Sequence, residues 1–252
     1  MHYENEDKNI LDLYPNEFVI SSNNSLLKYK NNKLQPAAKR SLDTDYMGSV
    51  RALNTEQEMA LELLLDNSIK CVVLKGGAGC GKTFLAAQAA IFLFEKKIYS
   101  KIFFTRNHIE IGRSIGALPG TSFDKLRPYI GSFVDQVSSW AVMQDLLDRK
   151  IVEVEAISFL QGRDFKDTFL IIDEAQNLDK KLIKMLLTRV GQGSKIVLCG
   201  DVQQIVSKEF ENGNNGIEYL IERFAGETEL FGMIELETTI RSELAALAVR
   251  LL

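Results

Sequence analysis

The sequence predicts an α/β fold in which helices cover both faces of a mostly parallel sheet. Short apolar runs, typical of buried strands, alternate with stretches whose apolar residues lie three and four positions apart, as in helices. Strands that alternate with helices join as parallel neighbours, and a parallel sheet needs cover on both faces. The apolar runs are residues 71–74, 101–104, 151–154, 169–172, 195–199 and 233–236.

The composition is typical of a globular protein with one sizeable core. Of the 252 residues, 46% are apolar and 25% are charged, which excludes disordered and fibrous chains. The most apolar window, Phe84 to Phe94, is too short to cross a bilayer, so we expect no membrane segment. The N-terminus lacks the basic start and apolar stretch of a secretory signal, which favours a cytoplasmic location.

Two parts of unequal size are expected along the chain. Residues 1–50 are polar and rich in Asn, and we interpret them as an N-terminal extension with room for a hairpin. Residues 51–252 carry all the strand and helix patterns and form the main domain. The cysteines at 71, 80 and 199 are far apart and show no CxxC spacing, so neither a disulfide framework nor a zinc site is indicated.

Local patterns predict where three of the helices lie. Thr55 and Glu58 form a capping box ahead of an apolar run, which marks a helix start. A second, largely apolar helix is predicted from Lys82 to Phe94. A third is predicted within residues 134–147, where we expect Trp140 to lie in the core rather than on a base-stacking surface.

The net charge of −4 conceals a basic segment. Between Lys70 and Ser132, ten basic residues stand against three acidic ones. A local positive field in an acidic protein suits a phosphate-binding or nucleic-acid-binding face, but lysines on solvated helices produce the same count. Charge alone leaves both interpretations open.

The strongest motif is the segment GGAGCGKT at residues 76–83, which matches GxxxxGK[ST] between a strand and a helix. Its glycines allow the backbone to curl around phosphates with N–H groups pointing inward. Lys82 would reach the β and γ phosphates, and the Thr83 hydroxyl would ligate Mg²⁺. The predicted nucleotide-binding residues are Gly77, Ala78, Gly79, Cys80, Gly81, Lys82 and Thr83.

Two carboxylates follow the apolar run 169–172 directly. Because the carboxyl ends of parallel strands meet at one edge of a sheet, Asp173 and Glu174 should lie beside the phosphate loop. Asp173 would then hold Mg²⁺ through its water shell, while Glu174 accepts a proton from the attacking water. An exposed acidic turn is the alternative if Asp-Glu is considered alone.

Two more strands deliver polar residues to the same edge. Run 195–199 leads to Gln204, which would sense the γ-phosphate or position the water. Run 101–104 leads to Arg106, which we assign with Arg113 to a nucleic-acid-binding face. Ordinary surface roles are the alternatives for both Gln204 and Arg106.

Several segments, in order, resemble the PhoH-like ATPases, which are RecA-fold NTPases related to the first core domain of superfamily 1 helicases. The resemblance runs from about residue 50 to the C-terminus. It implies a RecA-like P-loop NTPase fold, ATP hydrolysis, RNA or another single-stranded nucleic acid as partner, and ring-like homo-oligomers. The segments are GGAGCGKT, TRNHIEIGRSIGALPG, FLQGRDF, FLIIDEAQN, LLTRVGQGSKIVLCGD and RSELAALAVRLL.

The resemblance also implies roles for single residues. Lys82 and Thr83 are similar to the Walker A pair, and Asp173 and Glu174 to the Walker B pair.

Three further roles follow in the same way. Gln57 resembles the adenine-reading glutamine of helicase Q motifs, and Gln204 resembles the motif III glutamine. Arg241 resembles the late arginine of the family, a candidate finger on the γ-phosphate, with a surface charge at a helix start as the alternative.

The sequence departs from the family pattern in places. Cys80 stands where Thr is usual, Asn107 where Pro is usual, and Ile240 where Glu usually precedes the arginine, which weakens the assignment of Arg241. Longer relatives carry a nuclease-like PIN domain. Residues 13–40 resemble the segment that joins it to the ATPase, but the first 50 residues cannot contain that domain, so we expect no nuclease activity.

The function that these patterns favour is a Mg²⁺-dependent ATPase acting as an oligomeric, helicase-like motor on RNA. A complete monomeric helicase needs a second RecA-like domain, so neighbouring copies would have to close the site. The rival hypothesis is an ATP-gated nucleic-acid-binding switch that unwinds nothing. A small-molecule kinase is disfavoured, because the sequence shows no lid or acceptor-site signature.

Overall fold

A six-stranded, wholly parallel sheet forms the centre of the computed structural model, which describes residues 12–107, 131, 133–134, 139–160, 162–205, 210 and 215–237. The strand order is β11-β6-β10-β9-β7-β8. Every apolar run predicted as a strand is confirmed. The bounds are β6 (Cys71–Gly76), β7 (Lys101–Arg106), β8 (Val152–Val154), β9 (Thr168–Asp173), β10 (Lys195–Gly200) and β11 (Phe231–Leu236).

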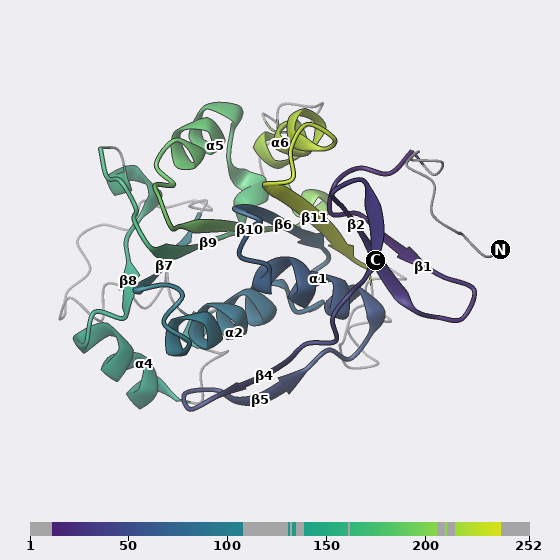
Figure 1. Cartoon of the computed structure of the whole chain (residues 1–252). Coiled ribbons are helices and arrows are strands. Elements are labelled where there is room, and N and C mark those ends of the chain that lie inside the picture. The colour runs from purple at the N-terminus through teal and green to yellow at the C-terminus, as the bar shows by residue number, and fades with distance from the viewer. Residues whose placement is uncertain are drawn as a thin grey trace, which may run out of the picture.

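Helices cover both faces of this sheet, as predicted (Figure 1). On β9, Phe169 and Ile171 join the core made with one group of helices, while Leu170 and Ile172 join the core made with the other group. Burial on both faces explains why the strands are almost continuously apolar. The first group is α1 (Thr55–Leu65), α2 (Lys82–Glu95) and α4 (Trp140–Asp148), and the second is α5 (Lys180–Leu187) and α6 (Gly216–Phe224).

Two local expectations about helices are wrong. The cap of α1 is Asn54, whose side chain accepts from the Gln57 N–H at 2.8 Å, so the proposed capping box at Thr55 does not form. Trp140 is the first residue of α4, after the cap Ser139, and the residue is 40% exposed rather than in the core. None of the described helices is both long and apolar enough to cross a membrane.

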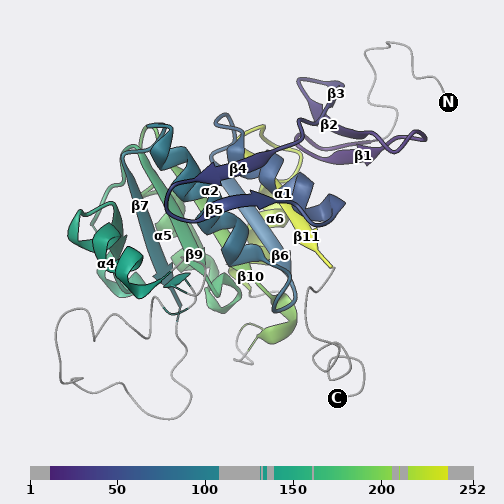
Figure 2. The same ribbon diagram turned by 90° about the horizontal axis from the view of Figure 1, so that it is seen from below.

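The described residues that precede α1 form two small antiparallel units (Figure 2). In the first unit, Asn31 and Asn32 make the turn between two strands, and both have positive φ, at 52° and 59°. Asn tolerates this conformation better than most residues, which accounts for part of the Asn content here. The units are β1 (Phe18–Ile20), β2 (Leu26–Lys30) and β3 (Lys33–Pro36), and then β4 (Ser41–Thr44) with β5 (Gly48–Arg51).

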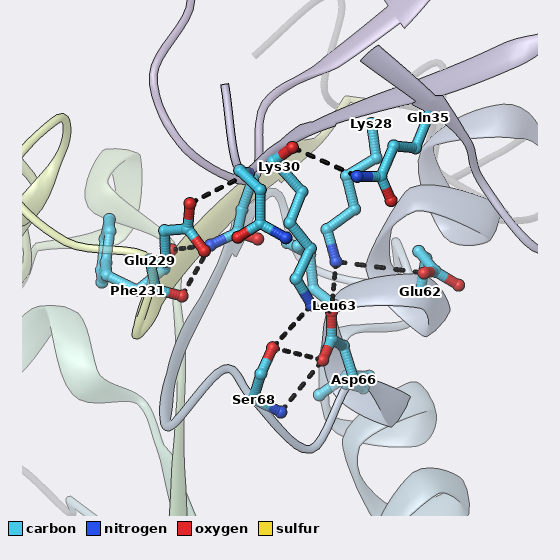
Figure 3. A network of polar contacts seen from close by, with 12 residues as sticks. Lys28, Lys30, Gln35, Glu62, Leu63, Asp66, Ser68, Glu229 and Phe231 are labelled. Carbon is cyan, nitrogen blue, oxygen red and sulfur yellow. Dashed lines mark hydrogen bonds and ion pairs between the residues drawn. The ribbon is translucent and has the colours of Figure 1, made fainter. Parts of the chain in front are cut away.

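Both units pack on the main domain. Leu42 of β4 is fully buried in the core that includes α1 and α2. On the three-stranded unit, the Lys28 and Lys30 ammonium groups each lie 2.7 Å from Asp66 Oδ2, at the end of α1 (Figure 3). Burial alone would raise the pKa of Asp66, but hydrogen bonds from both lysines and Ser68 outweigh it and lower that pKa. The boundary between extension and domain near residue 50 stays a prediction.

A buried lysine closes the same end of α1. Lys195, the first residue of β10, is fully buried, and its ammonium donates to the carbonyl oxygens of Leu63, Leu64 and Asp66 at 3.2, 2.5 and 2.9 Å. These are acceptors that a helix C-terminus leaves without intrahelical partners. Burial lowers the pKa of Lys195 to about 7. The carboxyl end of α1 is thus joined to the sheet and to the N-terminal unit.

Lys195 is expected to make stability depend on pH. Its pKa is about 7 in the folded protein and near its ordinary 10.5 when unfolded. Between these values the unfolded chain binds more protons, so the free energy of unfolding rises with pH, by at most about 1.4 kcal/mol per pH unit. Denaturant unfolding between about pH 7 and 8.5 measures this slope.

The variant Lys195→Met is predicted to have a shallower slope than the wild type, whatever its absolute stability. Lys33→Met removes an exposed lysine from β3 and should leave the slope unchanged. Equal slopes in the wild type and Lys195→Met would contradict the assignment.

Candidate nucleotide site

The carboxyl ends of β6, β7, β9 and β10 surround an open pocket of about 140 Å³. The sheet order places β10 between β6 and β9, so the phosphate loop and the two carboxylates flank one strand. The predicted convergence of these elements on one edge is confirmed. The pocket is lined by Ala78, Gly79, Lys82, Thr83, Arg106, Asp173, Glu174, Gln176, Cys199, Gly200, Asp201 and Gln204.

The phosphate loop depends on glycine backbone conformations. Gly76, Gly79 and Gly81 have φ of 146°, 82° and 96°. A Cβ on Gly76 would lie 2.3 Å from the Leu236 carbonyl oxygen, since β11 runs beside β6 at this point. Gly81 is the N-cap of α2, so the loop leads directly into a helix N-terminus whose N–H groups attract phosphate.

The side chain of Lys82 folds back onto the phosphate loop and hydrogen-bonds to it. The Lys82 ammonium donates to the carbonyl oxygens of Gly76 and Gly77, both at 2.7 Å, and lines the pocket. These two hydrogen bonds hold a positive charge over the loop that would cradle the phosphates. The glycine-rich loop, the helix N-terminus and this positive charge together fit the phosphates of a nucleoside triphosphate.

One hydrogen bond joins the two motifs that the sequence places ninety positions apart. The Thr83 hydroxyl donates to Asp173 Oδ1 at 2.9 Å. Thr83 is in the first turn of α2, and Asp173 is the buried last residue of β9. A hydroxyl and a carboxylate are oxygen ligands of the kind that Mg²⁺ prefers, so this pair fits a magnesium ion held between loop and strand.

Glu174 stands at a sharp turn immediately after β9. Its φ of 54° is in the left-handed region, which non-glycine residues rarely adopt and which is frequent at functional sites. Its Oε1 accepts from Arg106 Nη2 at 2.9 Å, and its Oε2 accepts from Gln176 Nε2 at 2.7 Å. Both carboxylate oxygens are therefore oriented by neighbouring side chains at the pocket wall.

The strand pattern predicts Arg106 at this edge, but it predicts neither the contact of Arg106 with the acidic pair nor a role for Gln176. Arg106, which the sequence assigns to a nucleic-acid face, lies beside the acidic pair, with Nε 3.8 Å from Asp173 Oδ2. Gln176 is buried and connects two strand ends, because its Oε1 accepts from the Asp201 N–H at 3.1 Å. The only available signal for Gln176 was its position two residues after Glu174 at a strand end.

The other predicted site residues lie in different surroundings. Gln204 is exposed and lines the pocket, with its N–H donating to the Asp201 carbonyl at 2.9 Å. Gln57 is buried beside the phosphate loop, where Nε2 donates to the Cys80 carbonyl at 3.3 Å and Oε1 accepts from the Leu53 N–H at 3.0 Å. Its base-reading role stays a prediction.

The remaining predicted site residues are two arginines and Cys80, and Cys199 is a second thiol that lines the pocket. Arg113 and Arg241 lie outside the described residues. Cys80 is buried, and its thiol donates to the Gly77 carbonyl oxygen at 3.0 Å, so it packs inside the loop. Cys199 is also buried and lines the pocket, and burial raises the pKa of its thiol.

The fold and the site define a P-loop NTPase domain with a RecA-like sheet. The family model described as "PhoH-like protein" matches residues 49–252. The "Protein PhoH2" of Bacillus subtilis is 42% identical over 218 residues, covering 83% of this chain and 49% of that protein. The "Protein PhoH2" of Mycolicibacterium smegmatis is 34% identical over 208 residues, covering 81% and 47%. The chain belongs to the PhoH-like family.

The chain spans about half the length of these curated relatives. Among solved structures, it is similar to the Pif1 helicase from Candida albicans, with 21% identity, a TM-score of 0.43, and coverage of 80% of this chain and 43% of that chain.

The glycine at the end of β6 allows a direct test of the loop geometry. Gly76→Ala should destabilise the protein by more than about 2 kcal/mol and weaken nucleotide binding, because its Cβ meets the Leu236 carbonyl and its φ is strained. Gly48→Ala is the matched control: φ is 71° there, yet a Cβ would meet no atom within 4 Å in the part of the chain that the structure describes. It should cost about 1 kcal/mol and leave nucleotide affinity unchanged. Equal effects of the two variants on nucleotide affinity would contradict the loop assignment.

Proposed function

We propose that this protein is a Mg²⁺-dependent ATPase that acts as a homo-oligomeric, helicase-like motor on single-stranded RNA or another nucleic acid. The hydrogen bond between Thr83 and Asp173 carries the proposal, since it brings the predicted metal ligands of two distant motifs together beside Lys82. Membership of the PhoH-like family supports nucleotide binding by this pocket.

The chain supplies the groups that hydrolysis requires. Lys82 and the N-terminus of α2 bind the phosphates, while Thr83 and Asp173 would hold Mg²⁺, which neutralises charge on the β and γ phosphates when bound. Glu174 orients a water molecule and accepts its proton, and Gln204 lies at the same pocket wall. Water is the phosphoryl acceptor in this proposal.

The proposals of a nucleic-acid partner and of a homo-oligomeric assembly rest on sequence observations. The excess of basic residues between Lys70 and Ser132 favours a polyanionic partner. One RecA-like domain leaves one side of the nucleotide uncovered, and we propose that a neighbouring copy in a ring closes it, with Arg241 as the finger. A finger supplied by a neighbour is typically worth about 10³ to 10⁵ in kcat.

An ATP-gated binding switch without unwinding activity is the second candidate. The same Thr83–Asp173 and Arg106–Glu174 contacts serve it equally well, because both functions need a pocket that responds to nucleotide. Stimulation of ATP turnover by RNA, with strand unwinding that is lost in Glu174→Gln, supports the motor. Tight RNA binding without stimulation supports the switch.

Two substitutions should separate nucleotide binding from hydrolysis. Lys82→Ala should abolish ATP binding, because it removes the charge over the phosphate loop. Glu174→Gln should bind ATP with near wild-type affinity and hydrolyse it at least about 100-fold more slowly, because the amide accepts no proton. Equilibrium ATP binding and phosphate release, measured across a range of protein concentrations, test both.

Lys150→Ala is the control, since Lys150 lies in the loop after α4, away from the pocket lining. Wild-type turnover per protomer should rise with protein concentration if neighbours complete the site. Full hydrolysis by Glu174→Gln would overturn the assigned role, and turnover independent of concentration would overturn the shared site.

A further inference from the structure

Arg106 is fixed beside the acidic pair by the sheet. It is the last residue of β7 and pairs in register with Asp173 of the neighbouring β9. The next residue, Asn107, strengthens this attachment: its N–H donates to the Asp173 carbonyl at 3.1 Å, and its side chain donates to the Asn177 carbonyl at 2.7 Å. The backbone of Arg106 is therefore held next to β9, and a change of contact partner requires movement of the Arg106 side chain alone.

The Arg106 guanidinium occupies one carboxylate oxygen of Glu174 that the proposed hydrolysis needs. Arg106 Nη2 donates to Glu174 Oε1 at 2.9 Å, and Arg106 Nε lies 3.8 Å from Asp173 Oδ2. A guanidinium bound to Oε1 competes with a water molecule for the same oxygen, and a general base must contact the water it deprotonates. While this ion pair persists, Glu174 is less available as a base.

The two partners of Glu174 differ in exposure to solvent and in how many other contacts they make. Gln176, on Oε2, is 1% exposed, and both ends of its residue are held: its side-chain oxygen accepts from the Asp201 N–H, and its backbone carbonyl accepts from Asn215. Arg106, on Oε1, has a side chain that is 28% exposed. Gln176 is therefore a fixed support, and Arg106 is the partner that a ligand from solution can reach.

We propose that Arg106 is a positioning residue that withholds Glu174 from the attacking water until a phosphodiester group of single-stranded nucleic acid takes the guanidinium. This inference rests on the proposed function. Arginine binds phosphate in a bidentate manner, with the same geometry as it binds a carboxylate, so the exchange keeps the guanidinium satisfied. The exchange links occupancy of the nucleic-acid site to the hydrolytic carboxylate through one side chain.

The size of the effect follows from the exposure of the pair. Ion pairs that are accessible to solvent are weak. A pair of this kind would leave Glu174 available as a base in about one molecule in five. Removal of the guanidinium should therefore raise basal ATP turnover about fivefold. It should also remove most of the stimulation by nucleic acid, because the step that nucleic acid promotes has already occurred.

The experiment compares Arg106→Gln and Arg106→Lys with Lys101→Gln. Lys101 begins the same strand at the opposite end of the sheet and pairs there with Glu153 at 2.5 Å, so its loss removes the same charge from β7 without touching the pocket. ATP turnover is measured without nucleic acid, with oligouridine, and with oligothymidine. The two oligonucleotides distinguish RNA from DNA as the source of the phosphodiester.

The expected result is a basal rate about fivefold above wild type for Arg106→Gln, a smaller rise for Arg106→Lys, and wild-type behaviour for Lys101→Gln. Stimulation by the effective oligonucleotide should fall towards onefold in Arg106→Gln. Arg106→Lys retains a charge at the strand end and keeps the test valid if the glutamine variant folds poorly.

The failures of the two proposals differ. If the wild type hydrolyses ATP and Lys82→Ala does not, but basal turnover in Arg106→Gln and Arg106→Lys equals or falls below wild type, the role of Arg106 is overturned and the ATPase proposal stands. If the wild type shows no turnover above Lys82→Ala with or without either oligonucleotide, both proposals fail.

Discussion

The hydrogen bond between Thr83 and Asp173 is the constraint on which the site depends. It forms because β10 lies between β6 and β9, which places the start of α2 opposite the end of β9 at one edge of the sheet. Parallel strands buried on both faces leave little freedom in this arrangement, since a slip in register would move core side chains to the wrong layer. The core therefore determines the distance between phosphate loop and carboxylate.

Around this contact, the site balances charge inside the protein. Arg106 lies against Asp173 and Glu174, and Lys82 lies against carbonyls of its own loop. A nucleotide or a phosphodiester would compete for these two cations. A metal ion would compete for the carboxylates that Arg106 contacts. Binding at this pocket is therefore an exchange of partners, and the free energy gained from a ligand is the difference between two sets of contacts. Such exchange is how a small ligand changes the availability of a side chain like Glu174.

The sequence predicted the elements whose signals are local and repeated. The six strands of the central sheet, the phosphate loop and the arrival of Asp173 beside that loop at one edge follow from apolar runs and from the geometry of parallel sheets; the direct Thr83–Asp173 hydrogen bond does not. It did not reveal the ion pair of Arg106 with Glu174, because a strand end predicts an edge but not the direction of a long side chain. Asn54 replaced the expected cap because several polar residues near a helix start compete for one position. Trp140 is exposed rather than in the core, since helical spacing alone does not locate the first residue of a helix.

The most direct test of the shared pocket is the effect of Mg²⁺ on ATP affinity in the wild type and in Thr83→Val, measured at equilibrium with the metal present or chelated. The variant keeps the size of the side chain and removes the hydroxyl that contacts Asp173. We expect Mg²⁺ to strengthen ATP binding in the wild type and most of this gain to be lost in Thr83→Val, while the affinity without metal is similar in both. An equal gain from Mg²⁺ in the two proteins would contradict this expectation.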